Sequence, residues 1–324
     1  MVELVGSLNL DTIRAAQERI RPHVHRTPVL TNSWLNDACR ASLFFKCENF
    51  QKVGAFKARG ATNAVFALDD ETARCGVATH SSGNHGAAVA RAAKLRAIPA
   101  HIVMPSNSAK VKIRAVESYG AQVVFCEPTE ESREIKCAEV INQTGAALIH
   151  SFENEHVVAG QGTAAMELLE DLPDLDVIMC PVGGGGLLSG TAIVAKSMRP
   201  QIKVIAVEPA NADDAAQSFR AGNRLVTQKR FTIADGLRTN IGEPNFAIIE
   251  QYVDDIVTVS EEAIVSAMRT IWETMKIVIE PSAAVPYAAI MQNKIAVSGK
   301  RVGIILTGGN IDLDALPWNC SRDR

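Results

Sequence analysis

The chain has 324 residues, of which 47% are hydrophobic and 21% charged, and its formal net charge at pH 7 is -3. This balance provides no basic excess to attract nucleic acid and is typical of a soluble enzyme or a small-molecule-binding protein. A folded chain of this length hides about 75% of its unfolded surface, so it can form two domains of ordinary size.

The start of the chain, Met1–Val5, lacks the basic region and the long apolar core of a secretory signal. No run of about 18 apolar residues is present that could cross a bilayer. Seven cysteines are scattered without any C-x-x-C spacing: Cys39, Cys47, Cys75, Cys126, Cys137, Cys180 and Cys320. This pattern favours reduced thiols over disulfides or a zinc site, and we expect a cytoplasmic protein.

Lys57 lies among small and apolar residues in the run Phe50–Gly60. Full burial can lower the pKa of a lysine by up to about 3–5 units, which leaves a neutral and nucleophilic amine. Such an amine forms Schiff bases with carbonyl compounds. The alternative is a surface lysine whose alkyl chain covers apolar neighbours.

Short apolar runs alternate with helical patterns from Gly76 to about Ser151. Strands are predicted at Gly76–Thr79, Ala100–Met104, Gln122–Phe125 and Ala147–His150. Helices are predicted over Gly86–Arg96 and Ala109–Tyr119. Strands that alternate with helices in this way form a parallel sheet.

A second α/β series follows. Its strands are predicted at Val177–Cys180, Val204–Val207 and Val302–Leu306, and its helices at Gly160–Leu169, Thr191–Met198 and Ser260–Met275. We therefore expect an α/β fold of two open twisted domains. The predicted large domain comprises residues 1–67 and 155–324, and a small flexible domain, 76–153, is inserted in it between hinges at 68–75 and 154.

The run Ser81–Gly86 follows the first strand of the small domain and precedes a helix. Its hydroxyl, amide and imidazole groups at a helix N-terminus suit a carboxylate or a ring hydroxyl. A helix cap with a structural histidine is the alternative interpretation.

Four glycines, Gly183–Gly186, connect a strand to a helix. Backbone N–H groups without side chains around them can close on an anion there, so the loop suits a phosphate. The dinucleotide fingerprint fails because Leu188 or Ser189 occupies the place of its last glycine, and the Walker pattern fails because Thr191 stands where a lysine is required. A tight structural turn is the alternative.

Two further segments follow predicted strands. The carboxylates and carbonyls of Glu208–Asp214 suit a hard divalent cation, although a solvated acidic loop has the same composition. Thr307–Asn310 ends the last strand, at the carboxyl edge where open sheets bind ligands, or forms a simple glycine turn.

Four motifs in this order resemble those of the fold-type II pyridoxal phosphate enzymes, the tryptophan synthase β-like group that includes the threonine dehydratases. They are Ala55–Gly60, Ser81–Gly86, Gly183–Gly186 and Thr307–Asn310, and the resemblance covers about Ile13–Leu313. Within the group the chain is most similar to the eukaryotic-type serine racemases, through Thr79–Gly86, Asn211–Asp214 and Val253–Ile256. Hydroxyaspartate dehydratases share Val53–Lys57.

The resemblance implies that Lys57 holds pyridoxal 5′-phosphate covalently and acts as the base on one face of the substrate α-carbon. Ser82 would be the acid or base on the other face. Phe56 would lie against the pyridine ring, Asn84 would bond its 3-hydroxyl, and Thr307 would face its nitrogen. The phosphate would be held by Gly183, Gly184, Gly185, Gly186 and Leu187.

The resemblance also implies sites for the substrate and for a metal. The substrate carboxylate would meet Ser81, Ser82, Asn84, His85 and Arg133. A structural Mg2+, Ca2+ or Mn2+ would be held by Glu208, the carbonyl of Ala212, and Asp214. A homodimer is expected as well.

A nucleotide effector is the least supported partner. Animal members of the group that respond to ATP carry a glutamine and a threonine where this chain has Ala87 and Val53. Both differences remove hydrogen-bonding groups, although Lys52, Tyr119 and Asn310 are kept. The sequence therefore leaves nucleotide activation open.

The function implied is interconversion of L- and D-serine, with dehydration of serine to pyruvate and ammonia as a side reaction. Racemisation needs proton exchange on both faces of the α-carbon, whereas elimination of the β-hydroxyl needs one base. The alternatives are a dehydratase for L-threo-3-hydroxyaspartate or threonine, and a non-catalytic module that binds pyridoxal or a nucleotide.

Overall fold

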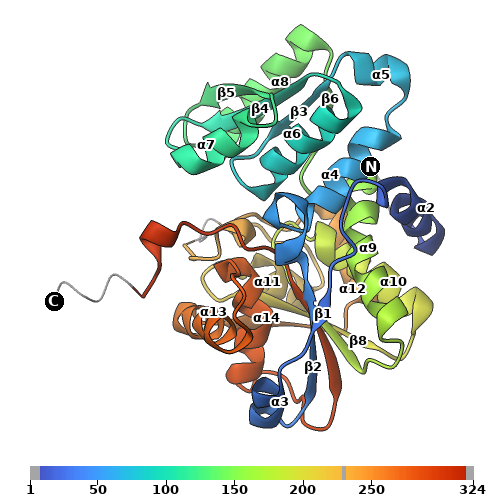
Figure 1. Cartoon of the computed structure of the whole chain (residues 1–324), viewed down its shortest axis with the longest axis vertical. Helices are drawn as coiled ribbons and strands as arrows, with labels where there is room; N and C mark the ends of the chain where they lie inside the picture. The colour runs from blue at the N-terminus through green and yellow to red at the C-terminus, as the bar shows by residue number, and fades with distance from the viewer. Residues whose placement is uncertain (1–7, 228–230, 319–324) are drawn as a thin grey trace, which may run out of the picture.

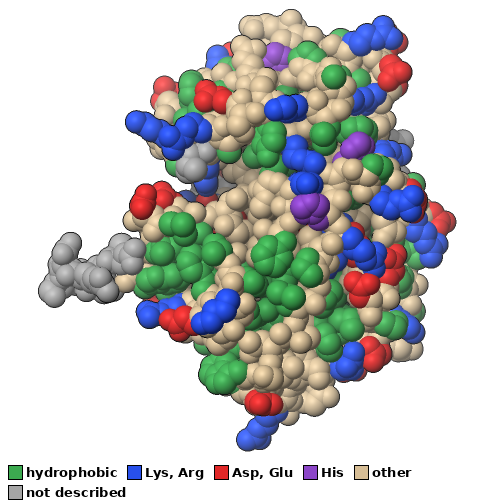
Figure 2. Space-filling view, in the orientation of Figure 1, with side chains coloured by type: hydrophobic (Ala, Val, Ile, Leu, Met, Phe, Trp, Pro, Cys, Tyr) green, Lys and Arg blue, Asp and Glu red, His purple; other side chains and the backbone are tan. Residues whose placement is uncertain are grey.

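The computed structural model describes residues 8–227 and 231–318. Met1–Val5 and Cys320 therefore lie outside the described residues. Figure 1 shows two α/β parts, a smaller one at the top and a larger one below it. Figure 2 shows a constriction between them and hydrophobic side chains gathered on the larger part.

The larger part is built on a six-stranded sheet in the order β1-β2-β10-β7-β8-β9. The strands are β1 (Val29–Leu30), β2 (Ser42–Cys47), β7 (Val177–Pro181), β8 (Lys203–Pro209), β9 (Asp255–Val259) and β10 (Arg301–Leu306). Among these described strands, β1 and β2 pair antiparallel and the other neighbours pair in parallel. This sheet confirms the predicted second series and adds β1, β2 and β9 to it.

Helices cover both faces of the large sheet. They are α2 (Leu10–Ile20), α3 (Ser33–Cys39), α9 (Glu155–Asp171), α10 (Gly186–Met198), α11 (Asp214–Ala221), α12 (Glu243–Tyr252), α13 (Glu261–Met275) and α14 (Pro281–Met291). Alternate residues of β7 point to opposite faces, as the pleat of a strand requires. Ile178 packs with α9 and α10, and Val177 packs with α13 and α14.

The smaller part is a four-stranded parallel sheet in the order β5-β4-β3-β6. Its strands are β3 (Val77–His80), β4 (Ala100–Pro105), β5 (Gln122–Cys126) and β6 (Ala147–Leu148), and its helices are α6 (Asn84–Arg96), α7 (Lys110–Glu117) and α8 (Glu130–Thr144). The predicted parallel sheet is confirmed. Gly76 was predicted within the first strand but lies before it, with a φ of +84°, because left-handed backbone suits a turn and not a strand.

Helix α4 (Lys57–Ala67) lies between the two parts and packs against both α6 and α9. Its residues Ala61, Ala64 and Val65 belong to the core of the small sheet. The predicted hinge 68–75 contains a short helix, α5 (Asp70–Arg74). The domain division at residue 67 and the mobility of the hinges therefore stay predictions.

The described residues also form four short 3-10 helices: η1 (Glu48–Phe50), η2 (Lys52–Gly54), η3 (Asp235–Leu237) and η4 (Leu313–Ala315). Across the described ranges, no helix combines the length and apolar character that crossing a membrane requires. The six cysteines within these ranges are free thiols, as the sequence predicted.

Candidate active site

One cavity of about 530 Å3 brings together the residues that the sequence predicted for cofactor and substrate. It is lined by loops that follow strands of both sheets. The predicted residues in its lining are Phe56, Lys57, Ser81, Ser82, Asn84, His85, Arg133, Gly183, Gly184, Gly185, Gly186, Leu187 and Thr307. Segments far apart in the sequence therefore form one site.

Lys57 begins α4 and projects its amine into this cavity. The Nζ atom donates a hydrogen bond to the carbonyl of Ser151, at 2.9 Å, and lies 5.1 Å from the centre of the Phe56 ring. Burial lowers the pKa of Lys57 to about 8, and the carboxylate of Glu280 opposes that shift. A useful fraction of the amine is therefore neutral near physiological pH.

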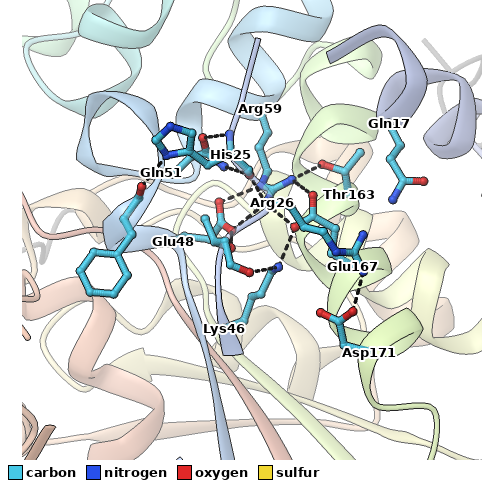
Figure 3. A network of polar contacts seen from close by, with 12 residues as sticks. Gln17, His25, Arg26, Lys46, Glu48, Gln51, Arg59, Thr163, Glu167 and Asp171 are labelled. Atoms are coloured by element: carbon cyan, nitrogen blue, oxygen red, sulfur yellow. Dashed lines mark hydrogen bonds and ion pairs between the residues drawn. The ribbon is translucent and has the colours of Figure 1, made fainter. Parts of the chain in front are cut away.

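A buried charge network anchors the first turn of α4 (Figure 3). Arg59 is fully buried, and its guanidinium binds Glu48 at 2.7 Å and Glu167 at 2.8 Å. Glu167 also accepts a hydrogen bond of 2.6 Å from Lys46, on β2. The network joins β2, η1, α4 and α9, and so fixes the helix turn that carries Lys57.

Removing one partner of this network should destabilise the protein strongly. We expect Glu48→Ala to lower the free energy of unfolding by about 3–5 kcal/mol, because it leaves the guanidinium of Arg59 buried with less compensation. Glu273→Ala is the matched control, since Glu273 pairs with Arg269 at an exposed site; it should cost less than about 1 kcal/mol. Urea unfolding measures both, and equal losses would contradict the structural role of the network.

The glycine loop follows β7 and opens α10. Gly185 caps the helix with a φ of +89°, a conformation that glycine adopts without strain. A Cβ atom on Gly184 would lie 2.3 Å from the ring of Phe152, so this position has no room for a side chain. The first N–H groups of a helix have no partner within it, and here they face a cavity. The loop therefore fits the phosphate of pyridoxal phosphate.

The loop after β3 leads into α6, which Gly83 caps. His85 lies in the first turn, and its Nε2 atom is 2.9 Å from the carbonyl of Ile149. A carbonyl only accepts, so Nε2 carries the proton, and burial lowers the pKa of His85 to about 3. The neutral ring then has an acceptor at Nδ1 and cannot donate to a carboxylate. If His85 contacts the substrate carboxylate, as the sequence predicted, its backbone N–H and not its ring would be the donor.

Thr307 and Asn84 offer polar groups to a cofactor ring. The hydroxyl of Thr307 is buried and has no hydrogen-bond partner among the described residues. Asn84 donates to both carboxylate oxygens of Glu280, at 3.0 and 3.1 Å, and accepts from Asn310 at 2.8 Å. An unpaired hydroxyl in a cavity wall is what a ring nitrogen would satisfy, so the residues present fit pyridoxal phosphate.

Among the residues of the cavity wall that the sequence did not point to are Lys112, Phe152, Asp235 and Glu280. Lys112, on α7, and Asp235, in η3, form a 2.7 Å ion pair between the two parts of the protein. Burial raises the pKa of Glu280 to about 7, and Asp235 adds to that shift. No local pattern marks these residues, because each gains its partner only through the fold.

Two of the predicted metal ligands lie close together and are buried. Glu208, at the end of β8, accepts from the amides of Ala215 and Ala216, at 3.2 and 2.9 Å. Asp214, at the start of α11, accepts from Ile241 at 2.7 Å. Burial and the carboxylate of Asp214 raise the pKa of Glu208. A divalent cation would relieve this repulsion.

The metal prediction uses two carboxylates and the carbonyl of Ala212. In the described ranges, no cluster of three or more His, Cys, Asp or Glu side chains suitable for a metal occurs. The predicted set differs from such a cluster because one of its three ligands is a backbone oxygen.

Comparisons of this chain with family models, with known sequences and with solved structures agree with one another. The model of the pyridoxal-phosphate dependent enzyme family matches residues 20–308. The chain is 50% identical to the β-hydroxyaspartate dehydratase of Paracoccus denitrificans, over 94% of this chain and 97% of that protein. It is 47% identical to the serine racemase of Dictyostelium discoideum, over 97% and 98%. The structure of maize serine racemase superposes with a TM-score of 0.94 at 46% identity, covering 97% of each chain.

Proposed function

Because the chain belongs to the family of pyridoxal-phosphate dependent enzymes, we propose that it interconverts L- and D-serine and also dehydrates serine to pyruvate and ammonia. The observation that carries this proposal is the cavity that Lys57, Ser82 and the glycine loop line together. Serine racemases that are 44–47% identical over nearly the whole chain support it.

Lys57 has the properties of the residue that binds the cofactor and moves a proton. Pyridoxal phosphate, when bound, withdraws electrons from the substrate so that the α-proton becomes acidic. The buried amine of Lys57, with a pKa of about 8, is suited both to covalent attachment and to proton transfer on one face of the α-carbon. The glycine loop would bind the phosphate and Thr307 the ring nitrogen.

Ser82 is the residue we assign to the opposite face. It comes from the loop before α6, whereas Lys57 comes from α4, so the two side chains approach the cavity from different elements. A serine hydroxyl is a weak acid and needs a neighbour to tune it, for which the cofactor phosphate is suited. The amides of Ser81–His85 would receive the substrate carboxylate, with Arg133 on α8.

A second function has direct support. The β-hydroxyaspartate dehydratase relative is 50% identical. In a dicarboxylate substrate, the amides of Ser81–His85 would receive one carboxylate and Arg133, in the cavity wall, the second. A dehydratase for L-threo-3-hydroxyaspartate would use the same lysine and the same glycine loop. Threonine is the further dehydratase substrate to consider.

One assay separates these functions. Purified enzyme is supplied in parallel with L-serine, D-serine, L-threonine and L-threo-3-hydroxyaspartate, and D-serine, L-serine and keto acids are measured. The proposal expects D-serine from L-serine, L-serine from D-serine, and pyruvate from both. Faster production of oxaloacetate than of D-serine would favour the hydroxyaspartate dehydratase. No turnover of any of the four substrates would indicate a non-catalytic module, and visible absorbance with added cofactor would then separate a module that binds pyridoxal from one that binds a nucleotide instead.

The pH dependence of cofactor capture tests the environment of Lys57. The rate at which the apoprotein attaches pyridoxal phosphate should rise with pH around a midpoint near the Lys57 pKa of about 8, well below that of an exposed lysine. Glu280 is mostly ionised at this pH and raises the pKa of Lys57, so Glu280→Gln should move the midpoint down. Stopped-flow absorbance measures the rate. An unchanged or raised midpoint would contradict the assigned interaction.

The metal site predicts a dependence on divalent cations. Removal of the metal with a chelator should lower both activity and melting temperature, because Glu208 and Asp214 then face each other without a cation. Mg2+ should restore both. Glu208→Gln should abolish the response to Mg2+. If neither the chelator nor Mg2+ changes the activity or the melting temperature of the wild type, the proposed metal site is wrong.

We also propose a homodimer. Large hydrophobic side chains are exposed, among them Trp34 at 60% and Leu313 at 61%, and Figure 2 shows apolar side chains gathered on the larger part. Such patches are typical of protein interfaces. A cytoplasmic location and a nucleotide effector stay predictions from the sequence.

A further inference from the structure

Asn245 lies behind the glycine loop, in the first turn of α12. It is 1% exposed and is absent from the described residues that line the cavity. Its Nδ2 atom donates two hydrogen bonds of 2.8 Å, one to the carbonyl of Phe152 and one to the carbonyl of Gly184. Both protons of the side-chain amide are therefore used, and they join two segments that are far apart in the sequence.

One of these hydrogen bonds orients the glycine loop. The carbonyl of Gly184 also accepts from the backbone of Gly242, at 3.1 Å, so two donors from α12 and its cap hold it. In a trans peptide the C=O and N–H bonds point in opposite directions. When the Gly184 carbonyl points to α12, the N–H of Gly185 points away from that helix, toward the cavity that Gly185 lines.

The other hydrogen bond orients the segment that Lys57 contacts. Phe152 follows Ser151, whose carbonyl accepts from the amine of Lys57 at 2.9 Å. The ring of Phe152 fills the space beside Gly184, where a Cβ would lie only 2.3 Å from it. Fixing the Phe152 carbonyl therefore fixes both the wall of the glycine loop and the acceptor for Lys57.

We infer that Asn245 is a positioning residue for pyridoxal phosphate, which sets the geometry of the phosphate loop and of the Lys57 partner without touching the cofactor. This inference rests on the proposed function. Both carbonyls need a donor at the same point, and an asparagine amide supplies two. A serine there would supply one donor, and an aspartate would supply none and would place a negative charge behind an anion site.

Titration of the apoprotein tests the inference. Dissociation constants for pyridoxal phosphate and for inorganic phosphate are measured by intrinsic fluorescence in the wild type, Asn245→Ser, Asn245→Ala and Asn245→Asp. We expect both constants to rise in that order, by about tenfold or more for Asn245→Ala, because two hydrogen bonds are lost.

Asn32→Ala is the matched control. The side chain of Asn32 also makes two hydrogen bonds, from Leu35 at 3.0 Å and to Thr274 at 3.2 Å, and it lies outside the cavity wall. It should lower the melting temperature of the apoprotein without changing either dissociation constant. If the Asn245 variants also lower the melting temperature without changing either dissociation constant, the positioning role is overturned.

The outcomes also separate this inference from the proposed function. A wild type that fails to bind pyridoxal phosphate would contradict both. A wild type that attaches the cofactor, with Asn245 variants of equal affinity, would overturn only the role of Asn245. If Asn245→Ala does not fold, Asn245→Ser and Asn245→Thr still decide. Each keeps one donor, so both should have higher dissociation constants for pyridoxal phosphate and inorganic phosphate than the wild type.

Discussion

Lys57→Ala is expected to lose both racemisation and dehydration of serine by at least about 10³-fold, because the variant lacks the covalent attachment point and a proton-transfer group together. The glycine loop is unchanged in this variant. It should therefore still bind pyridoxal phosphate without covalent attachment. Activity is measured as D-serine and pyruvate formed from L-serine, and binding as retention of cofactor after gel filtration.

Lys94→Ala provides the matched control for Lys57. Lys94 is an exposed lysine of α6 whose amine donates to the carbonyl of Ser118, and it is not in the cavity wall. Its replacement should leave both activities within about twofold of the wild type, as expected of a surface substitution. If Lys57→Ala retains most of either activity, Lys57 is not the residue that holds the cofactor and transfers the proton.

Ser82→Ala should separate the two reactions. We expect racemisation to fall by about 10²–10⁴-fold, the typical contribution of one general acid or base, while dehydration of L-serine keeps most of its rate. The reason is that elimination from L-serine needs a base on the Lys57 face alone. Racemisation needs a proton to arrive on the opposite face.

Hydrogen exchange in deuterated water makes the test of Ser82 specific to one face. The variant should exchange the α-proton of L-serine, through Lys57, and should lose exchange with D-serine. Both rates are measured by proton NMR with the same enzyme preparation and one enantiomer in each tube, so partial loss of folded protein affects them equally. Equal loss of exchange with the two enantiomers would contradict the two-base assignment.

The fold was predictable where strands are apolar and uninterrupted. The strands at Val177 and Val302 were found because both faces of a parallel strand are buried, which gives continuous apolar runs. Strand β2 was missed because it carries Lys46, whose charge is compensated inside the protein by Glu167. That compensation comes from a helix more than a hundred residues away, so the sequence near β2 gives no sign of it.

The site was predictable to the extent that its residues form local motifs. Lys57, the serine loop and the glycine loop each combine several unusual residues within a short run, and all of them line the cavity. Glu280 and Asn245 were missed because each is a single polar residue at or near the start of a helix and belongs to no local motif. Their importance comes from long-range contacts with Asn84 and Gly184, which only the folded chain reveals.

The account depends on a covalent bond between the amine of Lys57 and pyridoxal phosphate, with the phosphate bound in the glycine loop. Borohydride reduction of the enzyme saturated with cofactor, followed by proteolysis and peptide mass mapping, tests this most directly. The account predicts a single pyridoxyl label on the peptide that contains Lys57. A label on another residue, or none on the saturated protein, would contradict it.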